Sequence, residues 1–228
     1  MNKIYLCGGN KGGTGKSMLA TALIDAFLQR GVEPLLIETD DANPDVFKAH
    51  GERIQCAALS LDEADGWIEL INSLDKARGV PVIMNTAARN STGVARYGQT
   101  LKSTLGELGR TMVTLWVINR QRDSLELLAD YLDAMPAGAD HQVHVVRNGY
   151  FGSAEKFQLY NGSQLKQRIE EGGGLTLDFP DLADRVADQM ATQRLTIQGA
   201  LREMPLGHRA ELIRWRDEAF KVLGQVMT

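Results

Sequence analysis

The chain has 228 residues, a length that suits one large α/β domain, and we expect residues 1–228 to form a single domain. Its net charge of −4 excludes a general attraction to nucleic acid or anionic lipid, so such binding would need a local patch. Cys7 and Cys56 are isolated, which argues against a disulfide framework and against an iron–sulfur or zinc site. The sequence shows neither a signal-peptide pattern nor the ~20 apolar residues of a membrane span, and we expect a cytoplasmic protein.

Apolar runs alternate with helical patterns along the chain. The first helix should end near Gly31, a good C-cap residue, and the capping-box pattern Ser60-Leu61-Asp62-Glu63 predicts a second helix that extends to about Arg78. Strands are predicted at residues 4–7, 34–37, 53–59, 80–84, 111–118, 142–146 and 175–179. Helices are predicted at residues 16–30, 60–78, 124–134, 181–190, 196–203 and 207–223, with a partly helical segment after Asn90.

This alternation predicts a three-layer α/β/α fold with a mostly parallel central sheet. Ligands of such sheets bind beyond the carboxyl ends of the strands. The polar residues that follow each strand should therefore face one site: Asn10 to Ser17, Glu38 to Asp41, Asn85, Asn119-Arg120 and Asn148.

A glycine-rich loop follows the first strand and precedes the first helix. Its glycines allow successive backbone N–H groups to turn toward an anion, and the helix N-terminus adds partial positive charge. In this layout Gly12, Gly13, Thr14, Gly15, Lys16, Ser17 and Met18 would hold the phosphates of a nucleotide, with the Ser17 hydroxyl on Mg²⁺. Asn10 stands where the strict pattern has glycine, and an ordinary glycine-rich turn is the competing interpretation.

The run Lys11-Gly12-Gly13-Thr14-Gly15-Lys16-Ser17 resembles the deviant Walker A motif of the ParA/MinD superfamily, which are P-loop NTPases of the SIMIBI class. The likeness is close over about Lys3 to Asp45, and the opening also looks like the small TraL- or MobD-like ATPases of plasmids. The resemblance implies ATP and Mg²⁺ as cofactors and a homodimer formed on ATP binding. It also implies that Lys11 reaches the partner's nucleotide and that Lys16 acts in catalysis. Alternatively, Lys11 is a solvated loop cation.

Glu38-Thr39-Asp40 stands where the family carries Asp-x-Asp after the second strand. By resemblance, Asp40 would position the attacking water or contribute to the metal shell. The alternative is that Asp40 and Asp41 form a solvated turn before Pro44.

Asn85 departs from the family pattern, which places the Walker B aspartate at the end of the third family strand. An amide oxygen can accept a hydrogen bond from a Mg²⁺-bound water but brings no charge. Either Mg²⁺ affinity and turnover are low, or Asp40 or Asp41 supplies the charge. On this basis Asn85→Asp would raise Mg²⁺-dependent turnover.

Asn148 ends another apolar strand, where the family uses an asparagine to contact the adenine edge. An amide donates and accepts at once, which suits a purine. A turn residue in Asn148-Gly149 is the competing interpretation.

Three functions fit these patterns. The first is a dimeric, slowly hydrolysing ATPase that positions or regulates DNA or a protein complex. The second is a small-molecule P-loop ligase or kinase of the dethiobiotin-synthetase type, for which the aromatic loop from Tyr150 to Tyr160 could line a substrate pocket. The third is a nucleotide-binding regulator with little hydrolysis, suggested by Asn85.

The C-terminal helices carry arginines interrupted by acidic residues, which is usually a solvated face. DNA binding by an ATP-bound dimer stays open, and an unidentified protein partner is expected. The terminal residues 223–228 lack the cations of a membrane-binding helix, so no membrane interaction is expected.

Overall fold

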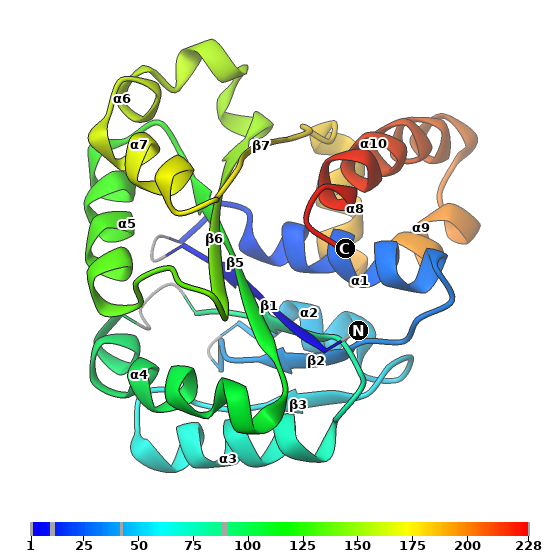
Figure 1. The fold of residues 1–228 in the computed structure, drawn as a ribbon. Helices are drawn as coiled ribbons and strands as arrows, with labels where there is room; N and C mark the ends of the chain where they lie inside the picture. Colours follow the sequence, from blue (N-terminus) through cyan, green and yellow to red (C-terminus); the bar gives the residue numbers. More distant parts are fainter. Residues whose placement is uncertain (1, 10–11, 42, 88–90, 228) are drawn as a thin grey trace.

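The computed structural model describes residues 2–9, 12–41, 43–87 and 91–227. Its centre is a sheet of seven strands in the order β3-β2-β4-β1-β5-β6-β7, and every neighbouring pair is parallel (Figure 1). The expected α/β fold class is therefore confirmed. The strands are β1 Lys3–Gly8, β2 Leu35–Glu38, β3 Cys56–Ala58, β4 Val82–Asn85, β5 Thr111–Ile118, β6 His141–Asn148 and β7 Thr176–Phe179.

Helices cover both faces of the sheet. One hydrophobic cluster joins β1 and β5 to α1, α8, α9 and α10, and a second packs α3, α4, α5 and α7 against the other face (Figure 1). Burial of the apolar sheet on both faces is what its near-continuous apolar strands predict. The helices are α1 Lys16–Gln29, α2 Asp45–His50, α3 Ala64–Lys76, α4 Ser91–Leu108, α5 Arg122–Ala134, α6 Gln158–Asn161, α7 Gln164–Glu171, α8 Asp184–Gln193, α9 Ile197–Glu203 and α10 Leu206–Gly224.

The helices differ from the sequence-based predictions in two ways. The helix assigned to a capping box at Ser60 begins at Ala64 instead, and Leu61, which precedes it, is buried in the core. Three helices, α2, α6 and α7, have no counterpart among the predicted helices. These are short helices whose sequences lack a long apolar stripe, so periodicity gives little signal for them.

The last helix, α10, is hydrogen-bonded to the first helix, α1. Arg216 of α10 donates two hydrogen bonds to Asp25 of α1, at 2.6 and 3.0 Å, and Asp25 is buried. Arg30 donates to the carbonyl of Met227. These contacts fix the direction of α1, whose N-terminus follows the glycine-rich loop.

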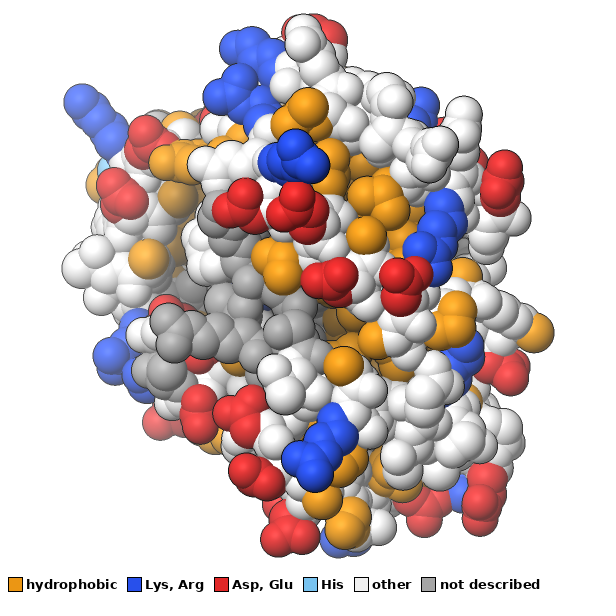
Figure 2. Space-filling view, turned by 90° about the vertical axis from the view of Figure 1, so that its left-hand side faces the viewer, with side chains coloured by type: hydrophobic (Ala, Val, Ile, Leu, Met, Phe, Trp, Pro, Cys, Tyr) orange, Lys and Arg blue, Asp and Glu red, His pale blue; other side chains and the backbone are white. Residues whose placement is uncertain are grey.

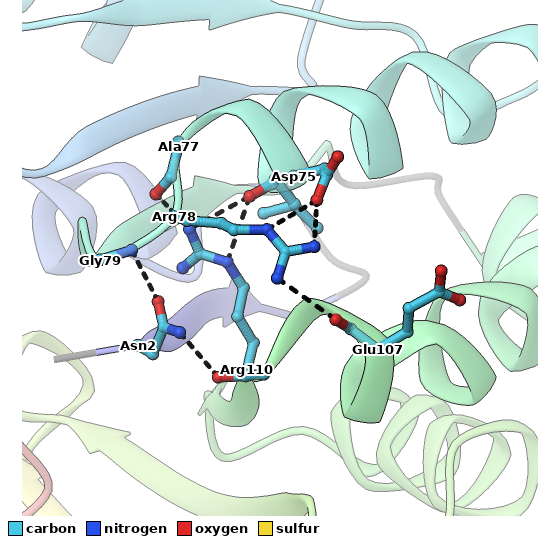
Figure 3. A network of polar contacts seen from close by, with 9 residues as sticks. Asn2, Asp75, Ala77, Arg78, Gly79, Glu107 and Arg110 are labelled. Carbon is cyan, nitrogen blue, oxygen red and sulfur yellow. Dashed lines mark hydrogen bonds and ion pairs between the residues drawn. The ribbon is translucent and has the colours of Figure 1, made fainter.

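A second polar network lies at the amino ends of the strands, opposite the glycine-rich loop (Figure 3). The guanidinium of Arg110, just before β5, donates to the backbone carbonyls of Leu74, Ala77 and Val80 at the end of α3. Asn2 joins Gly79 to Gly109 by accepting from one and donating to the other. No helix among the described residues is long and apolar enough to cross a membrane.

Candidate functional site

The glycine-rich loop leaves β1 beyond the carboxyl end of the sheet and becomes α1 at Lys16. Gly13 and Gly15 have φ of 73° and 102°, which are left-handed values that favour glycine. Gly15 is the N-cap of α1, and no described side chain caps this helix end. The first turn of α1 also holds no acidic residue. Its backbone N–H groups can therefore take an anion as their hydrogen-bond partner.

Lys16 is the first residue of α1 and is only 7% exposed. Burial lowers the pKa of its ammonium, and the nearby Asp40 carboxylate opposes this shift. A cation buried at the start of a helix has positive potential from both the charge and the helix dipole. This is the electrostatic environment that a triphosphate requires.

Asn148 anchors the loop to the end of β6. Its Nδ2 donates to the carbonyl of Thr14 at 2.8 Å, while its Oδ1 accepts from the backbone N–H of Tyr150 at 3.1 Å. A Cβ at Gly15 would lie 2.4 Å from the same Nδ2, so only glycine allows this close approach. The amide expected to contact adenine thus holds the glycine-rich loop in this structure.

Two polar side chains meet at the ends of β2 and β4. Glu38 and Asn85 are partners in the register of these parallel strands, and each is 1% exposed. The Asn85 Nδ2 donates to both carboxylate oxygens of Glu38, at 3.0 and 3.1 Å. Burial raises the pKa of Glu38 to about 6, although the hydrogen bond from Asn85 favours the charged form.

This pair lies beside the serine expected to ligate Mg²⁺. The Asn85 Nδ2 is 3.4 Å from the Ser17 Oγ, and the Ser17 side chain is exposed. The Asn85 Oδ1 is buried and has no hydrogen-bond partner among the described residues. An acceptor in that condition fits a metal-bound water, because a buried polar atom that stays unpaired costs free energy.

No three His, Cys, Asp or Glu residues gather as a metal site within the ranges that the structure describes. Mg²⁺ commonly takes few protein ligands and keeps its waters and the substrate phosphates. Ser17 together with Asn85 and Glu38 would suffice for that kind of site.

Asp40 lies at the rim of the site and is partly exposed. Its backbone N–H donates to Glu38 Oε1 at 3.1 Å, and its own Oδ1 accepts from the N–H of Asn43 at 3.0 Å. Lys11, the residue expected to cross a dimer interface, lies outside the described residues, as does Asn10.

Glu38 was expected among the polar residues that face the site, whereas the metal or catalytic role was expected for Asp40. Two features of the sequence point to Glu38. It directly follows the apolar strand Leu35-Leu36-Ile37, and Asn85, at the end of the neighbouring strand, is an amide where a carboxylate is expected. The aromatic loop proposed as a pocket wall splits in two, because Phe157 and Tyr160 are buried in the core while Tyr150 is exposed.

Comparison with known proteins agrees with this geometry. A family model described as the CobQ/CobB/MinD/ParA nucleotide binding domain matches residues 6–146. Protein MobD of Acidithiobacillus ferrooxidans is 57% identical over 224 residues, which cover 98% of this chain and 97% of MobD.

Two solved structures share the fold at low identity. The MinD cell division protein of Aquifex aeolicus superposes with a TM-score of 0.53 at 12% identity, over 99% of this chain and 98% of that one. A ParA family ATPase of Chlorobium tepidum gives a TM-score of 0.52 at 14% identity, over 95% and 98%. The resemblance drawn from the loop residues is thereby confirmed, and the chain belongs to the CobQ/CobB/MinD/ParA family of nucleotide-binding domains.

Proposed function

We propose that this chain binds ATP with Mg²⁺ and acts as a slowly hydrolysing switch that dimerises on ATP. As in plasmid partition or mobilisation, the dimer would position or regulate DNA or a protein complex. The observation that carries the proposal is the loop from Gly12 to Ser17, which leads into an uncapped helix with a buried lysine at its first position. Family membership and the likeness to MobD support it.

Each loop element has a distinct role in this proposal. The backbone N–H groups of Gly13 to Ser17 bind phosphate oxygens, and Lys16 offsets their charge. Mg²⁺, when bound, neutralises charge that builds up on the phosphates. Ser17 and the Glu38–Asn85 pair face that ion, while Asp40 positions the attacking water. Lys11 reaches the nucleotide of the second subunit.

A protein partner or DNA would bind to a surface of the dimer. Figure 2 shows acidic, basic and hydrophobic side chains interspersed on the side of the molecule that bears α4 to α7. On α10, Arg214 forms ion pairs with Glu211 and Glu218, and Arg216 pairs with the buried Asp25. These pairs reduce the positive charge available for DNA, which favours a protein as the first partner to test.

The small-molecule ligase or kinase is less well supported. Its main feature was the aromatic loop, and the inward burial of Phe157 and Tyr160 leaves only part of that loop to line a substrate pocket. The family includes nucleotide-binding domains of several kinds, so the decisive property is ATP-dependent association.

Lys11→Ala is expected to raise the dimer dissociation constant in ATP by at least about tenfold, because an interfacial cation opposite phosphate would be lost. Light scattering coupled to size-exclusion chromatography measures this, with ATP and with ADP. Lys76→Ala is the matched control, since Lys76 is exposed at the far end of α3. A wild-type chain that stays monomeric with ATP, or a dimer indifferent to Lys11→Ala, would contradict the switch.

Asn148→Ala tests how the β6 amide acts. Loss of its hydrogen bond to the Thr14 carbonyl removes about 1 kcal/mol, or roughly fivefold in affinity. The contacts of Asn148 favour a role in positioning the loop. In that case the affinities for ATP and for GTP, measured by isothermal titration, fall by the same factor. A loss confined to ATP would instead identify adenine recognition. Asn2→Ala, which changes an amide at the opposite end of the sheet, should leave both affinities unchanged.

A further inference from the structure

We propose that Glu38 carries the negative charge that faces Mg²⁺ in this protein, and that Asn85 orients it. Of the two strand ends where the family carries a carboxylate, β2 keeps one in Glu38 and β4 has the amide of Asn85. The inference rests on the proposed function, because it assigns the metal shell of the same nucleotide site. It departs from the sequence-based alternatives, which placed the charge on Asp40 or Asp41.

The register of the sheet places Glu38 directly beside Asn85, where the family's second carboxylate is missing. Glu38 and Asn85 are paired residues on adjacent parallel strands, so their side chains leave the same face of the sheet side by side. A carboxylate on β2 can therefore reach nearly the same position as a carboxylate on β4. Glutamate has one more methylene than aspartate, which extends its reach from the neighbouring strand.

The hydrogen bonds give the amide a defined orientation. The Asn85 Nδ2 points to an acceptor-only carboxylate, which fixes the Oδ1 on the other side. That Oδ1 is the buried acceptor without a described partner, and the Ser17 Oγ lies 3.4 Å from the Nδ2. The Nδ2 of Asn85 therefore lies within hydrogen-bond distance of both the Glu38 carboxylate and the Ser17 hydroxyl, beside the start of α1.

These contacts hold the Glu38 carboxylate in place without neutralising its charge. Its hydrogen-bond donors, the Asn85 amide and the backbone N–H groups of Asp40 and Phe47, are neutral groups. Asp41 is exposed and Asp40 is partly exposed, so water screens both carboxylates. The buried Glu38 is the carboxylate whose field acts on a nearby cation with least screening.

This geometry reverses the expectation for Asn85→Asp. A second carboxylate would stand within hydrogen-bond distance of Glu38, and two such groups cannot both ionise cheaply. The single variant would gain little negative charge, so a rise in Mg²⁺-dependent turnover is no longer expected.

The test measures Mn²⁺ binding by electron paramagnetic resonance, in complexes with the nonhydrolysable analogue AMP-PNP. Glu38→Gln is expected to weaken Mn²⁺ binding by about tenfold or more, which is the usual effect of losing an outer-shell partner. The double variant Glu38→Gln/Asn85→Asp returns one carboxylate and one amide to the pair and should recover affinity to within about threefold of wild type. Asp41→Asn, which removes an exposed charge from the next turn, should leave Mn²⁺ affinity unchanged.

The outcomes separate this inference from the proposed function. AMP-PNP binding in EDTA reports the nucleotide site alone, and its absence in the wild-type chain would overturn both. With nucleotide binding intact, unchanged Mn²⁺ affinity in Glu38→Gln would overturn the inference only. A double variant that binds Mn²⁺ no more tightly than Glu38→Gln would overturn the inference, and so would an equal loss of Mn²⁺ affinity in Asp41→Asn.

Discussion

Replacing Lys16 with methionine is expected to weaken ATP binding by about 100-fold. Charge-assisted hydrogen bonds contribute about 1.5–3 kcal/mol each, and loss of about 3 kcal/mol corresponds to about 100-fold in affinity. Lys16 lies at the first position of α1, where its charge adds to the helix dipole. Isothermal titration with ATP measures the loss.

The same substitution is expected to stabilise the protein when nucleotide is absent. Lys16 is 7% exposed, and this burial penalises the ammonium and lowers its pKa. Methionine keeps the apolar stem without the charge, so the desolvation cost of the buried ammonium is removed and we expect the free energy of unfolding to rise by about 1 kcal/mol. Asp40, which loses a favourable neighbour, is partly exposed and remains hydrated.

Together these two effects predict that Lys16→Met is more stable than wild type without ATP and less stable than wild type with ATP. At a concentration 100 times its dissociation constant, ATP adds about 2.7 kcal/mol to the wild-type chain and almost nothing to the variant. Urea denaturation with and without ATP measures both values. Lys48→Met on α2, an exposed position, should follow wild type in each case. Equal stabilisation of Lys16→Met and wild type by ATP would contradict the role given to Lys16.

The sequence predicts the fold class well because the strands that form the centre of the sheet are strongly apolar. The predicted strand at 111–118 coincides with β5, and the first helix differs from α1 by one residue at its end. Local turn chemistry was less reliable. The apparent capping box at Ser60 failed because tertiary packing of Leu61 determines the path of those residues.

The candidate site was predictable to the level of the strand end, but not to the level of the hydrogen bond. Placing Glu38 and Asn85 after two strands requires only the alternation of apolar runs. That they are register partners follows from strand order, since β4 lies between β2 and β1 in space although β3 precedes it in sequence. Which carboxylate is buried is therefore a property of the assembled sheet.

Asn148 illustrates the same limit. Its strand-end position was read correctly, whereas its partner, the Thr14 carbonyl, is 134 residues away in sequence. Buried arginines are still harder to foresee, because a charged residue in a short connection normally reads as solvent-exposed. Arg110, between α4 and β5, is 2% exposed.

Arg110→Met is expected to lower the free energy of unfolding by about 3 kcal/mol. Its guanidinium donates hydrogen bonds to the carbonyls of Leu74, Ala77 and Val80 (Figure 3). Leu74 lies in the last turn of α3, and the other two residues follow this helix. Carbonyls at a helix C-terminus have no intrahelical partner, and a cation there also interacts favourably with the helix dipole. Each buried polar group left unpaired costs about 1–3 kcal/mol, and partial hydration of the carbonyls reduces the sum.

For a chain of this size, a loss of about 3 kcal/mol corresponds to a fall in Tm of roughly 6–12 °C. Arg78→Met is the matched control, because Arg78 lies in the same network but its ion pair with Asp75 is exposed and should contribute less than about 1 kcal/mol. Since Arg110 lies at the end of the sheet opposite the glycine-rich loop, ATP affinity of the folded Arg110→Met protein should match wild type. A loss of stability no greater than that of Arg78→Met would show that water replaces the guanidinium at α3 without cost.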